Sequence, residues 1–286
     1  MSSELTEIAG GLGFLEAPRW HEGELWFSDF HSRTVTSMNS KGDFQRRAYI
    51  AGQPSGLGFN TGGSFLVVST HDRHLYRCIA DAKELFADLS TVHRGGLNDM
   101  FVDSKGRAYV SAFPEPVIGP DDGSHMADPT VPLFLIQPDG REDIVAEGLQ
   151  IPNGIGLTAD GSTLIVAETL GNRLTAFKVA GDGTLSDRRL FADVGERAPD
   201  GLCLDANGGV WFGSFSTSEF VLVEDGGRIA QVIETPGKLA VACALGGADG
   251  RTLYCITVDK ATFDFYQGHG TGSIEMCHVD IPAIGA

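Results

Sequence analysis

The sequence of 286 residues predicts an all-β protein, a six-bladed β-propeller of four-stranded blades whose ring is closed by the N-terminal strand. Three observations favour this fold. Apolar residues at helical spacing are missing over any useful length, short runs rich in Val, Ile, Phe, Tyr and Trp alternate with turns, and one glycine-containing turn recurs six times. Because no linker-like stretch interrupts the series, residues 1–286 are expected to form one propeller domain.

The recurring turn is expected to mark one hairpin in each blade. Each copy supplies a glycine where the chain needs a positive φ, and an apolar strand such as residues 25–27 or 210–212 follows it. Units of about 40 residues that repeat in this way are typical of propeller blades. The six turns span residues 21–23, 61–63, 103–106, 158–161, 205–208 and 247–250.

The N-terminal segment is predicted to close the ring. Residues 5–9 resemble residues 142–146, both in sequence and in their distance from the strand that follows. Residues 142–146 are expected to form an outer strand, and the last blade, which ends near Asp280, lacks its own copy. The N-terminal strand therefore completes the C-terminal blade, and no open sheet edge remains at the seam.

A ring of oxygen donors is predicted at one end of the propeller, because the first strand of every blade lines the central axis. The position three or four residues before the apolar core of that strand is equivalent in all blades. Four of the six residues there offer a side-chain carboxylate or carboxamide oxygen. The six are Glu16, Ser55, Asn98, Asn153, Asp200 and Val241.

This pattern has a simple electrostatic interpretation. Two carboxylates that converge on an axis repel each other, and loss of water makes the repulsion worse. A divalent cation between them resolves the conflict and uses all four oxygens. A set without Cys or His suits a hard ion, Ca²⁺ first, with Mg²⁺, Mn²⁺ or Zn²⁺ also possible, and leaves positions for water and substrate.

An alternative is that these residues only make turns. Asn153-Gly154 and Asp200-Gly201 are ordinary turn dipeptides. Asn98 is followed by Asp99 and Glu16 by Ala17, however, so the turn explanation fails for those two. The matching register in four repeats favours a functional site.

Four motifs surround the predicted ring: GFLEAPRW at 13–20, LND at 97–99, IPNGI at 151–155 and APDGL at 198–202. Together they resemble the senescence marker protein (regucalcin), gluconolactonase and luciferin-regenerating enzyme family. The resemblance runs in the right order from about Leu5 to Asp280. It implies a six-bladed propeller with one divalent metal ion near the axis, and in many members hydrolysis of sugar lactones or related cyclic esters.

The resemblance also implies roles for individual residues. The metal ligands of the family fall on Glu16, Asn153 and Asp200, with Asn98 completing the shell or meeting the substrate. The general base of the family falls on Asp200. Asp99 is expected to steady the ligands beside it.

One position departs from the family. Members of the regucalcin type carry an Arg two residues before the Asn of the Asn-Asp motif, and this chain has Gly96 there, with Arg94 two residues further back. An Arg at this place would bind substrate hydroxyls through its fork of donors. Its absence favours a less polar lactone or ester over a polyhydroxylated sugar lactone.

The longest spacing between ring positions, from Asn98 to Asn153, contains a proline-rich segment at residues 113–129. This segment is expected to overhang the site and shape the pocket, although a surface loop without substrate contact is the alternative, and whether it forms a lid stays open. Asn98, His71, Phe113 and Glu115 are the predicted substrate-binding residues. His71 also fits a solvated or capping role.

Composition limits the partners. The net charge of −17 argues against nucleic acids and anionic membrane surfaces, and no apolar run approaches the roughly 20 residues that span a bilayer. No secretory signal is apparent at residues 1–7. Five cysteines without a C-x-x-C pair indicate reduced thiols, and the expected location is cytoplasmic.

The sequence thus predicts a metal-dependent hydrolase that opens a lactone or another activated ester, with a small-molecule substrate. The metal would polarise the carbonyl, and Asp200 would take a proton from the attacking water. Two alternatives remain open: a phosphotriesterase-like hydrolase on the same metal site, and a calcium-binding regulatory protein without catalysis. A propeller used only for protein interaction would leave the oxygen donors unexplained.

Overall fold

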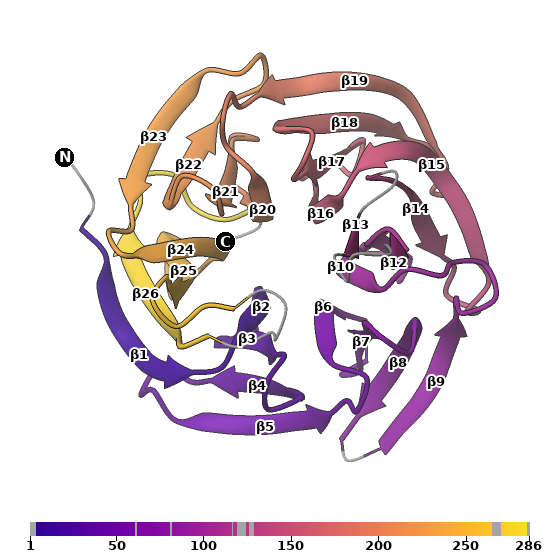
Figure 1. Cartoon of the computed structure of the whole chain (residues 1–286), viewed down its shortest axis with the longest axis horizontal. Coiled ribbons are helices and arrows are strands. Elements are labelled where there is room, and N and C mark those ends of the chain that lie inside the picture. Colours follow the sequence, from indigo (N-terminus) through magenta and orange to yellow (C-terminus); the bar gives the residue numbers. More distant parts are fainter. Residues whose placement is uncertain are drawn as a thin grey trace.

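A computed structural model describes residues 4–60, 62–80, 82–115, 117–118, 124–125, 129–264 and 270–284. These residues contain no helix, and all but two of their strands form six four-stranded antiparallel sheets. The sheets stand around a common axis as the blades of a ring, which Figure 1 shows in a view along that axis. The predicted all-β fold with six blades is confirmed.

The strands of the first five blades follow one another from the axis to the rim in chain order. Blade 1 contains β2 (Leu15–His21), β3 (Glu24–Asp29), β4 (Thr34–Met38) and β5 (Phe44–Tyr49). Blade 2 contains β6 (Pro54–Phe59), β7 (Phe65–Ser69), β8 (His74–Ile79) and β9 (Ala82–Asp88). Blade 3 contains β10 (Leu97–Val102), β11 (Ala108–Ala112), β14 (Thr130–Ile136) and β15 (Glu142–Gln150). Blade 4 contains β16 (Pro152–Leu157), β17 (Thr163–Glu168), β18 (Arg173–Val179) and β19 (Leu185–Asp193). Blade 5 contains β20 (Pro199–Leu204), β21 (Val210–Ser214), β22 (Glu219–Val223) and β23 (Ile229–Glu234).

The sixth blade joins the two ends of the chain. Its inner strands are β24 (Lys238–Gly246), β25 (Thr252–Asp259) and β26 (Gly272–His278), and its outermost strand is β1 (Thr6–Leu12). Strand β1 pairs antiparallel with β26, with Thr6 opposite Met276 and Leu12 opposite Gly272. The predicted closure by the N-terminal strand is confirmed, and the strand runs further than residues 5–9.

The hydrophobic core is divided among the interfaces between blades. In the described residues, six apolar clusters each combine side chains from two neighbouring blades. Phe191 of blade 4 lies with Phe212 of blade 5, for example, and Phe27 of blade 1 lies with Ile274 of blade 6. Burial of apolar surface between sheets contributes about 25 cal/mol per Å², so the ring is held by packing as well as by the β1–β26 hydrogen bonds.

The glycine turns lie at the end of the ring where the inner strands finish, called the trailing end below. Gly106 and Gly208 take φ values of +77° and +82°, and their N–H groups donate to the carbonyls of Asp103 and Asp205 at 2.9 and 3.0 Å. Each Asp carboxylate also accepts backbone N–H groups within its own turn. The glycines therefore serve the hairpin turns that the repeats predicted.

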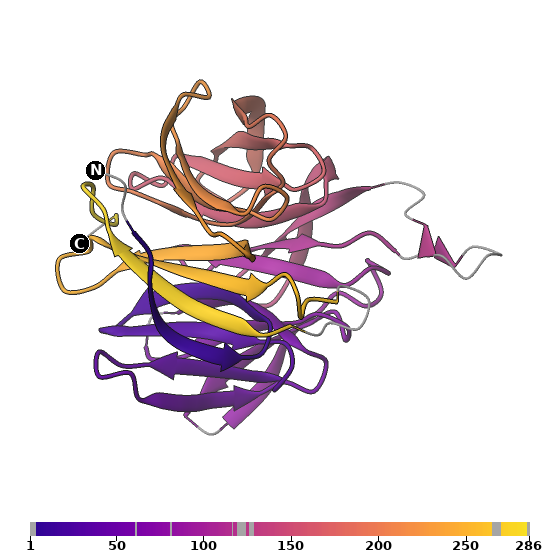
Figure 2. The same ribbon diagram turned by 60° about the vertical axis from the view of Figure 1, so that its left-hand side comes forward.

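The opposite end, at which the inner strands begin, is called the leading end below. The chain leaves β11 at this end, because Leu97 at the start of β10 pairs with Ala112 at the end of β11. A two-stranded sheet of β12 (Val117–Ile118) and β13 (Ser124–His125) projects from there, as Figure 2 shows. The rest of residues 116–128 lies outside the described part of the chain, so the predicted overhang of the site is untested.

Candidate active site

The four predicted oxygen donors, called the oxygen ring below, occupy equivalent places in four blades. Each is the second residue of its inner strand: Glu16 in β2, Asn98 in β10, Asn153 in β16 and Asp200 in β20. Asn98, Asn153 and Asp200 are buried, and Glu16 is partly exposed. The fold thus places all four near the start of strands that surround the axis (Figure 1).

A β-bulge recurs at this level in all six blades. The pairing of inner and second strand shifts between Leu97 and Met100 in blade 3 and between Pro152 and Ile155 in blade 4. The other four blades show the same irregularity at the corresponding place. Bulges re-aim side chains and are common beside functional sites, so they give a structural reason for the shared register of the oxygen ring.

The glycines after two ring positions serve packing between strands. Gly154 and Gly201 lie inside β16 and β20. A Cβ atom on Gly154 would lie 2.6 Å from the backbone of the next inner strand, and one on Gly201 would lie 2.3 Å from Cβ of Ala242. The alternative that Asn153 and Asp200 merely open turns is therefore wrong: their glycines let neighbouring inner strands approach closely.

Three carboxyl groups crowd this end of the axis. Burial, and then the charges of Asp200 and Asp99, raise the pKa of Glu16 well above its ordinary value. Burial and the charge of Asp99 raise the pKa of Asp200 to about 8, although a hydrogen bond with the Asn153 side chain opposes the rise. Burial also raises the pKa of Asp99 against the opposing charge of Arg19. The site favours protonated carboxyls unless a positive charge compensates them.

The donors fit a hard divalent cation. Within the described part of the chain, Oδ1 of Asp200 and Oδ2 of Asp99 are buried without a hydrogen-bond partner. Among the same residues, no three His, Cys, Asp or Glu side chains are grouped to hold a metal ion. A cation here would therefore need the amide oxygens of Asn98 and Asn153 beside the carboxylates, a set that suits Ca²⁺.

Asp99 contacts a residue that the sequence did not point to. Arg19 donates from Nη2 to Oδ1 of Asp99 at 2.8 Å and to the carbonyl of Met100 at 2.8 Å. The Met100 N–H also donates to Oδ1 of Asp99 at 2.7 Å. The equivalent positions of the other blades carry no Arg, so no repeat pattern could have shown the role of Arg19.

Buried hydroxyl groups behind the oxygen ring were also missed. Ser28 in β3 donates to the carbonyl of Ser55 at 2.6 Å, and Ser111 in β11 donates to the carbonyl of Asn153 at 3.0 Å. In both cases a serine near the end of a second strand holds the ring position of the next blade. The sequence did carry a sign of these residues, because a polar residue stands near the end of the second strand in every blade. All six are fully buried: Ser28, Ser69, Ser111, Glu168, Ser214 and Thr257.

Of the four predicted substrate-binding residues, Asn98 lies in β10 and the other three lie in connections at the leading end. His71 is exposed and follows β7, and its N–H donates to the Gly52 carbonyl at 2.9 Å. Phe113 follows β11 and is partly buried, and its carbonyl lies 2.8 Å from Nε2 of His93. Glu115 is exposed and lies 3.9 Å from Arg94. That these three residues contact a substrate stays a prediction.

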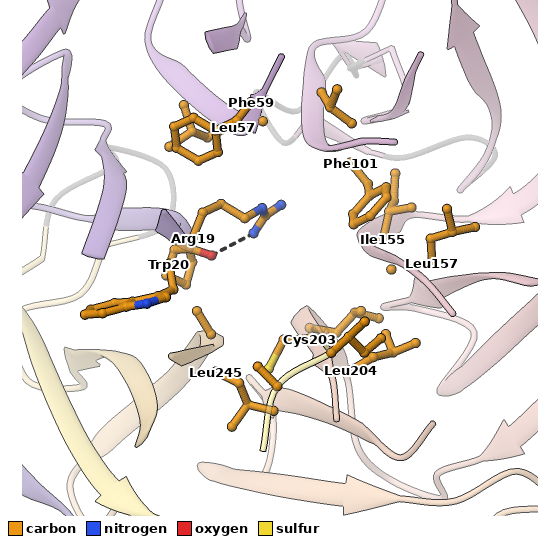
Figure 3. Close-up of a pocket in the computed structure, with 18 residues that line it drawn as sticks. Arg19, Trp20, Leu57, Phe59, Phe101, Ile155, Leu157, Cys203, Leu204 and Leu245 are labelled. Carbon is orange, nitrogen blue, oxygen red and sulfur yellow. Dashed lines mark hydrogen bonds between the residues drawn. The ribbon is translucent and has the colours of Figure 1, made fainter. Parts of the chain in front are cut away.

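An apolar cavity of about 350 Å³ lies further along the axis, toward the trailing end (Figure 3). Side chains from the later parts of the inner strands line it, among them Leu57, Phe101 and Leu204, together with Ile284 near the C-terminus. Among the described residues, Arg19 is the one charged residue in this lining, and no member of the oxygen ring takes part. The candidate site is therefore the oxygen ring itself, on the leading side of Arg19.

Comparisons with known proteins agree with this fold and these motifs. The SMP-30/Gluconolactonase/LRE-like region model matches residues 14–259. Pentonolactonase XacC of Haloferax volcanii is 24% identical over 281 residues, which cover 94% of this chain and 91% of that protein.

Two solved structures show the same architecture. A luciferin-regenerating enzyme superposes with a TM-score of 0.81 at 17% identity, covering 98% of this chain and 97% of the other. Regucalcin of Agrobacterium tumefaciens strain C58, described as a calcium-binding protein, superposes with a TM-score of 0.76 at 19% identity and covers 100% of this chain and 98% of its own. At these identities the two structures show the fold alone.

Proposed function

We propose that this chain, which belongs to the SMP-30/gluconolactonase/LRE-like family, is a metal-dependent hydrolase that opens a lactone at the oxygen ring. The observation that carries the proposal is the meeting of Glu16, Asn98, Asn153 and Asp200 at one level of four inner strands. The name of the Haloferax relative, a pentonolactonase that aligns with 94% of this chain, supports lactones as the substrate class.

Glu16, Asn153 and Asp200 would hold one divalent ion, with Asn98 completing the shell or meeting the substrate. We propose Ca²⁺, because all four donors are oxygens and a structural relative is described as calcium-binding. When bound, such an ion would polarise the lactone carbonyl and stabilise the negative charge that develops on its oxygen. Its positive charge would also keep Glu16 and Asp200 ionised, against the rise in pKa that burial causes.

Asp200 is proposed as the general base. Its Oδ1 is buried and has no hydrogen-bond partner in the described part of the chain, so this atom can accept the proton of a water molecule that attacks the carbonyl. Asn98 would orient the water or the carbonyl through its amide. Asp99 lies next to Asn98 and is fixed by Arg19, so it would keep the Asn98 strand in place rather than touch substrate.

The cysteines support a reducing compartment, and the cytoplasm is our proposal for the location. All five are free thiols, including Cys203 and Cys243, whose sulfurs lie 3.8 Å apart. Neighbouring thiols that stay unpaired fit a reducing environment.

The test is removal and return of the metal. Protein purified without added metal is analysed for bound ions, stripped with a chelator, and assayed on a lactone panel before and after addition of Ca²⁺, Mg²⁺, Mn²⁺ or Zn²⁺. We expect lactone hydrolysis to disappear with the ion and to return best with Ca²⁺. Hydrolysis of phosphotriesters in place of lactones would favour the phosphotriesterase alternative, and Ca²⁺ binding without any turnover would favour a regulatory protein.

A further inference from the structure

The oxygen ring is interrupted on the side of the sixth blade. The ring position of that blade is Val241 in β24, which is fully buried and apolar. Blade 6 lies between blade 1, which carries Glu16, and blade 5, which carries Asp200 (Figure 1). The arc between the two carboxylates therefore offers no polar ring residue of its own.

Three aromatic rings, called the aromatic bridge below, connect these three blades at the leading end. Phe263 lies in the connection from β25 to β26, with its ring centroid 5.6 Å from that of Phe14 and 5.4 Å from that of Phe215. Phe14 precedes β2 of blade 1, and Phe215 follows β21 of blade 5. All three residues are partly exposed, so apolar surface is available there.

Backbone hydrogen bonds place Phe14 and Phe215 beside the carboxylate strands. The Phe30 N–H donates to the carbonyl of Phe14 at 2.9 Å, and Phe14 is two residues before Glu16. The Phe215 N–H donates to the carbonyl of Ala198 at 3.1 Å, and Ala198 is two residues before Asp200. The aromatic bridge therefore lies beside the starts of both carboxylate strands, in the arc where Val241 supplies no polar ring residue.

The opposite side of the ring offers an aromatic residue as well. A Cβ atom on Gly96 would lie 3.6 Å from Cδ2 of Phe113 and 3.0 Å from Cγ2 of Thr70. The Phe113 N–H donates to the Gly96 carbonyl at 2.8 Å, so the backbone of Phe113 is held beside Gly96. Arg94 does not replace a donor at Gly96, because its side chain is 82% exposed and lies 3.9 Å from Glu115.

We infer that the substrate is a lactone whose ring bears an apolar alkyl or aryl substituent, which packs against Phe14, Phe215 and Phe263. This inference rests on the lactone hydrolysis proposed above and adds the substrate class. Aromatic side chains bind apolar groups through buried area, and they offer a sugar hydroxyl no hydrogen bond. A polyhydroxylated lactone would lose hydrogen bonds to water against these rings without recovering them.

The experiment compares lactones that differ only in the substituent. Unsubstituted γ-butyrolactone, its γ-alkyl derivatives of increasing chain length, and glucono-δ-lactone are assayed by proton release at saturating metal. We expect kcat/KM to rise about threefold or more for each of the first added methylenes, the scale of burying a CH₂ group, and glucono-δ-lactone to be the poorest substrate of the panel.

Variants of Phe263 test whether the aromatic bridge binds the substituent. Phe263→Ser should remove most of the dependence of kcat/KM on chain length. Phe263→Leu should retain much of the dependence, because it keeps an apolar side chain at the same place. Phe44→Ala is the matched control, since Phe44 lies in the rim strand β5 and is 46% exposed, and it should change nothing.

Binding of alkyl-substituted lactams, measured by calorimetry, separates this inference from the proposed activity. If alkyl chains do not increase kcat/KM or lactam affinity, or if glucono-δ-lactone is the best substrate, the inference is wrong while lactone hydrolysis stands. If no lactone is hydrolysed, the proposed activity fails. In that case, length-dependent lactam binding that Phe263→Ser abolishes would still support the apolar surface, and its absence would overturn that as well.

Discussion

Arg19 of blade 1 and Asp99 of blade 3, the two blades that flank blade 2, form an ion pair with Nη2 and Oδ1 2.8 Å apart. Arg19 lies three residues after Glu16, and Asp99 directly follows Asn98. The pair therefore ties the strand of one oxygen-ring carboxylate to the strand of one oxygen-ring amide. The Asp99 side chain is only 5% exposed, so its charge depends on this partner.

Arg19→Met should destabilise the metal-free protein by about 3 to 5 kcal/mol, the cost of leaving one partner of a buried pair uncompensated. Adding Asp99→Asn to this variant should recover much of the loss, because the buried charge is removed while an oxygen remains for the Met100 N–H. Urea unfolding in the presence of chelator measures both free energies. Addition of Ca²⁺ should raise the stability of Arg19→Met more than that of the wild type, since the single variant has one more uncompensated negative charge near the oxygen ring.

The exposed pair of Arg189 and Asp225 provides the control. Arg189→Met should change the free energy of unfolding by less than about 1 kcal/mol, as is usual for surface ion pairs. A double variant no more stable than Arg19→Met alone would show that the pair is not the source of the effect.

The repeat made most of the fold predictable. Each blade carries the same turn and the same ring position, so Glu16, Asn98, Asn153 and Asp200 could be aligned without a structure. The likeness of residues 5–9 to residues 142–146 revealed the closure in the same way, and β1 does pair with β26. These features are local patterns that recur, and recurrence is visible in one sequence.

Contacts that occur only once in the ring could not be predicted from the sequence. Arg19 meets Asp99 only because the ring brings the inner strands of blades 1 and 3 close together on either side of blade 2. Phe14, Phe215 and Phe263 are far apart in the chain and come together through ring closure. The Asn153-Gly154 dipeptide looked like a turn because the sequence could not show the neighbouring backbone 2.6 Å from the missing Cβ.

Asn153→Ala should weaken metal binding by about tenfold or more. The substitution removes a neutral oxygen donor and also the hydrogen bond that holds the Asp200 side chain. Calorimetric titration of chelator-treated protein with Ca²⁺ measures the change. Asn207→Ala, in an exposed turn at the trailing end, is the matched control. Equal affinities in the two variants would remove Asn153 from the ligand set.

Glu168 is expected to make the protein sensitive to acid. It is fully buried at the end of β17 and accepts hydrogen bonds from Arg173, Arg188 and the Gln150 N–H. Burial raises its pKa, but the hydrogen bonds from Arg173, Gln150 and Thr175 outweigh burial, so the pKa lies below its ordinary value. The folded state then binds this proton less readily than the unfolded state does.

The sign of the effect follows from that difference. The stabilisation by Glu168 is complete above the unfolded pKa of about 4.3 and is lost as pH falls through the lower folded value. Glu168→Gln should therefore be less stable than the wild type at pH 7, and the gap should narrow as the solution is acidified toward pH 3. Thermal unfolding across this range tests it, with the exposed Glu147→Gln as control. A gap that stays constant with pH would contradict the assignment.

Asp200→Asn separates metal binding from proton transfer. The substitution keeps the size of the side chain and one oxygen donor, but it removes the charge and the basicity. If Asp200 only holds the metal, excess Ca²⁺ should restore activity once occupancy is restored. If Asp200 also takes the proton from water, turnover should stay depressed by about 10² or more at full occupancy, the usual scale for loss of a general base.

We expect the second result, because Oδ1 of Asp200 is buried and has no hydrogen-bond partner among the described residues. Hydrolysis rate and bound metal must be measured on the same sample, so that low occupancy cannot imitate lost chemistry. Asp225→Asn, at an exposed position on blade 5, should keep both quantities at the wild-type level. Near-native turnover of Asp200→Asn at full occupancy would remove Asp200 from proton transfer and leave it the single role of holding the ion.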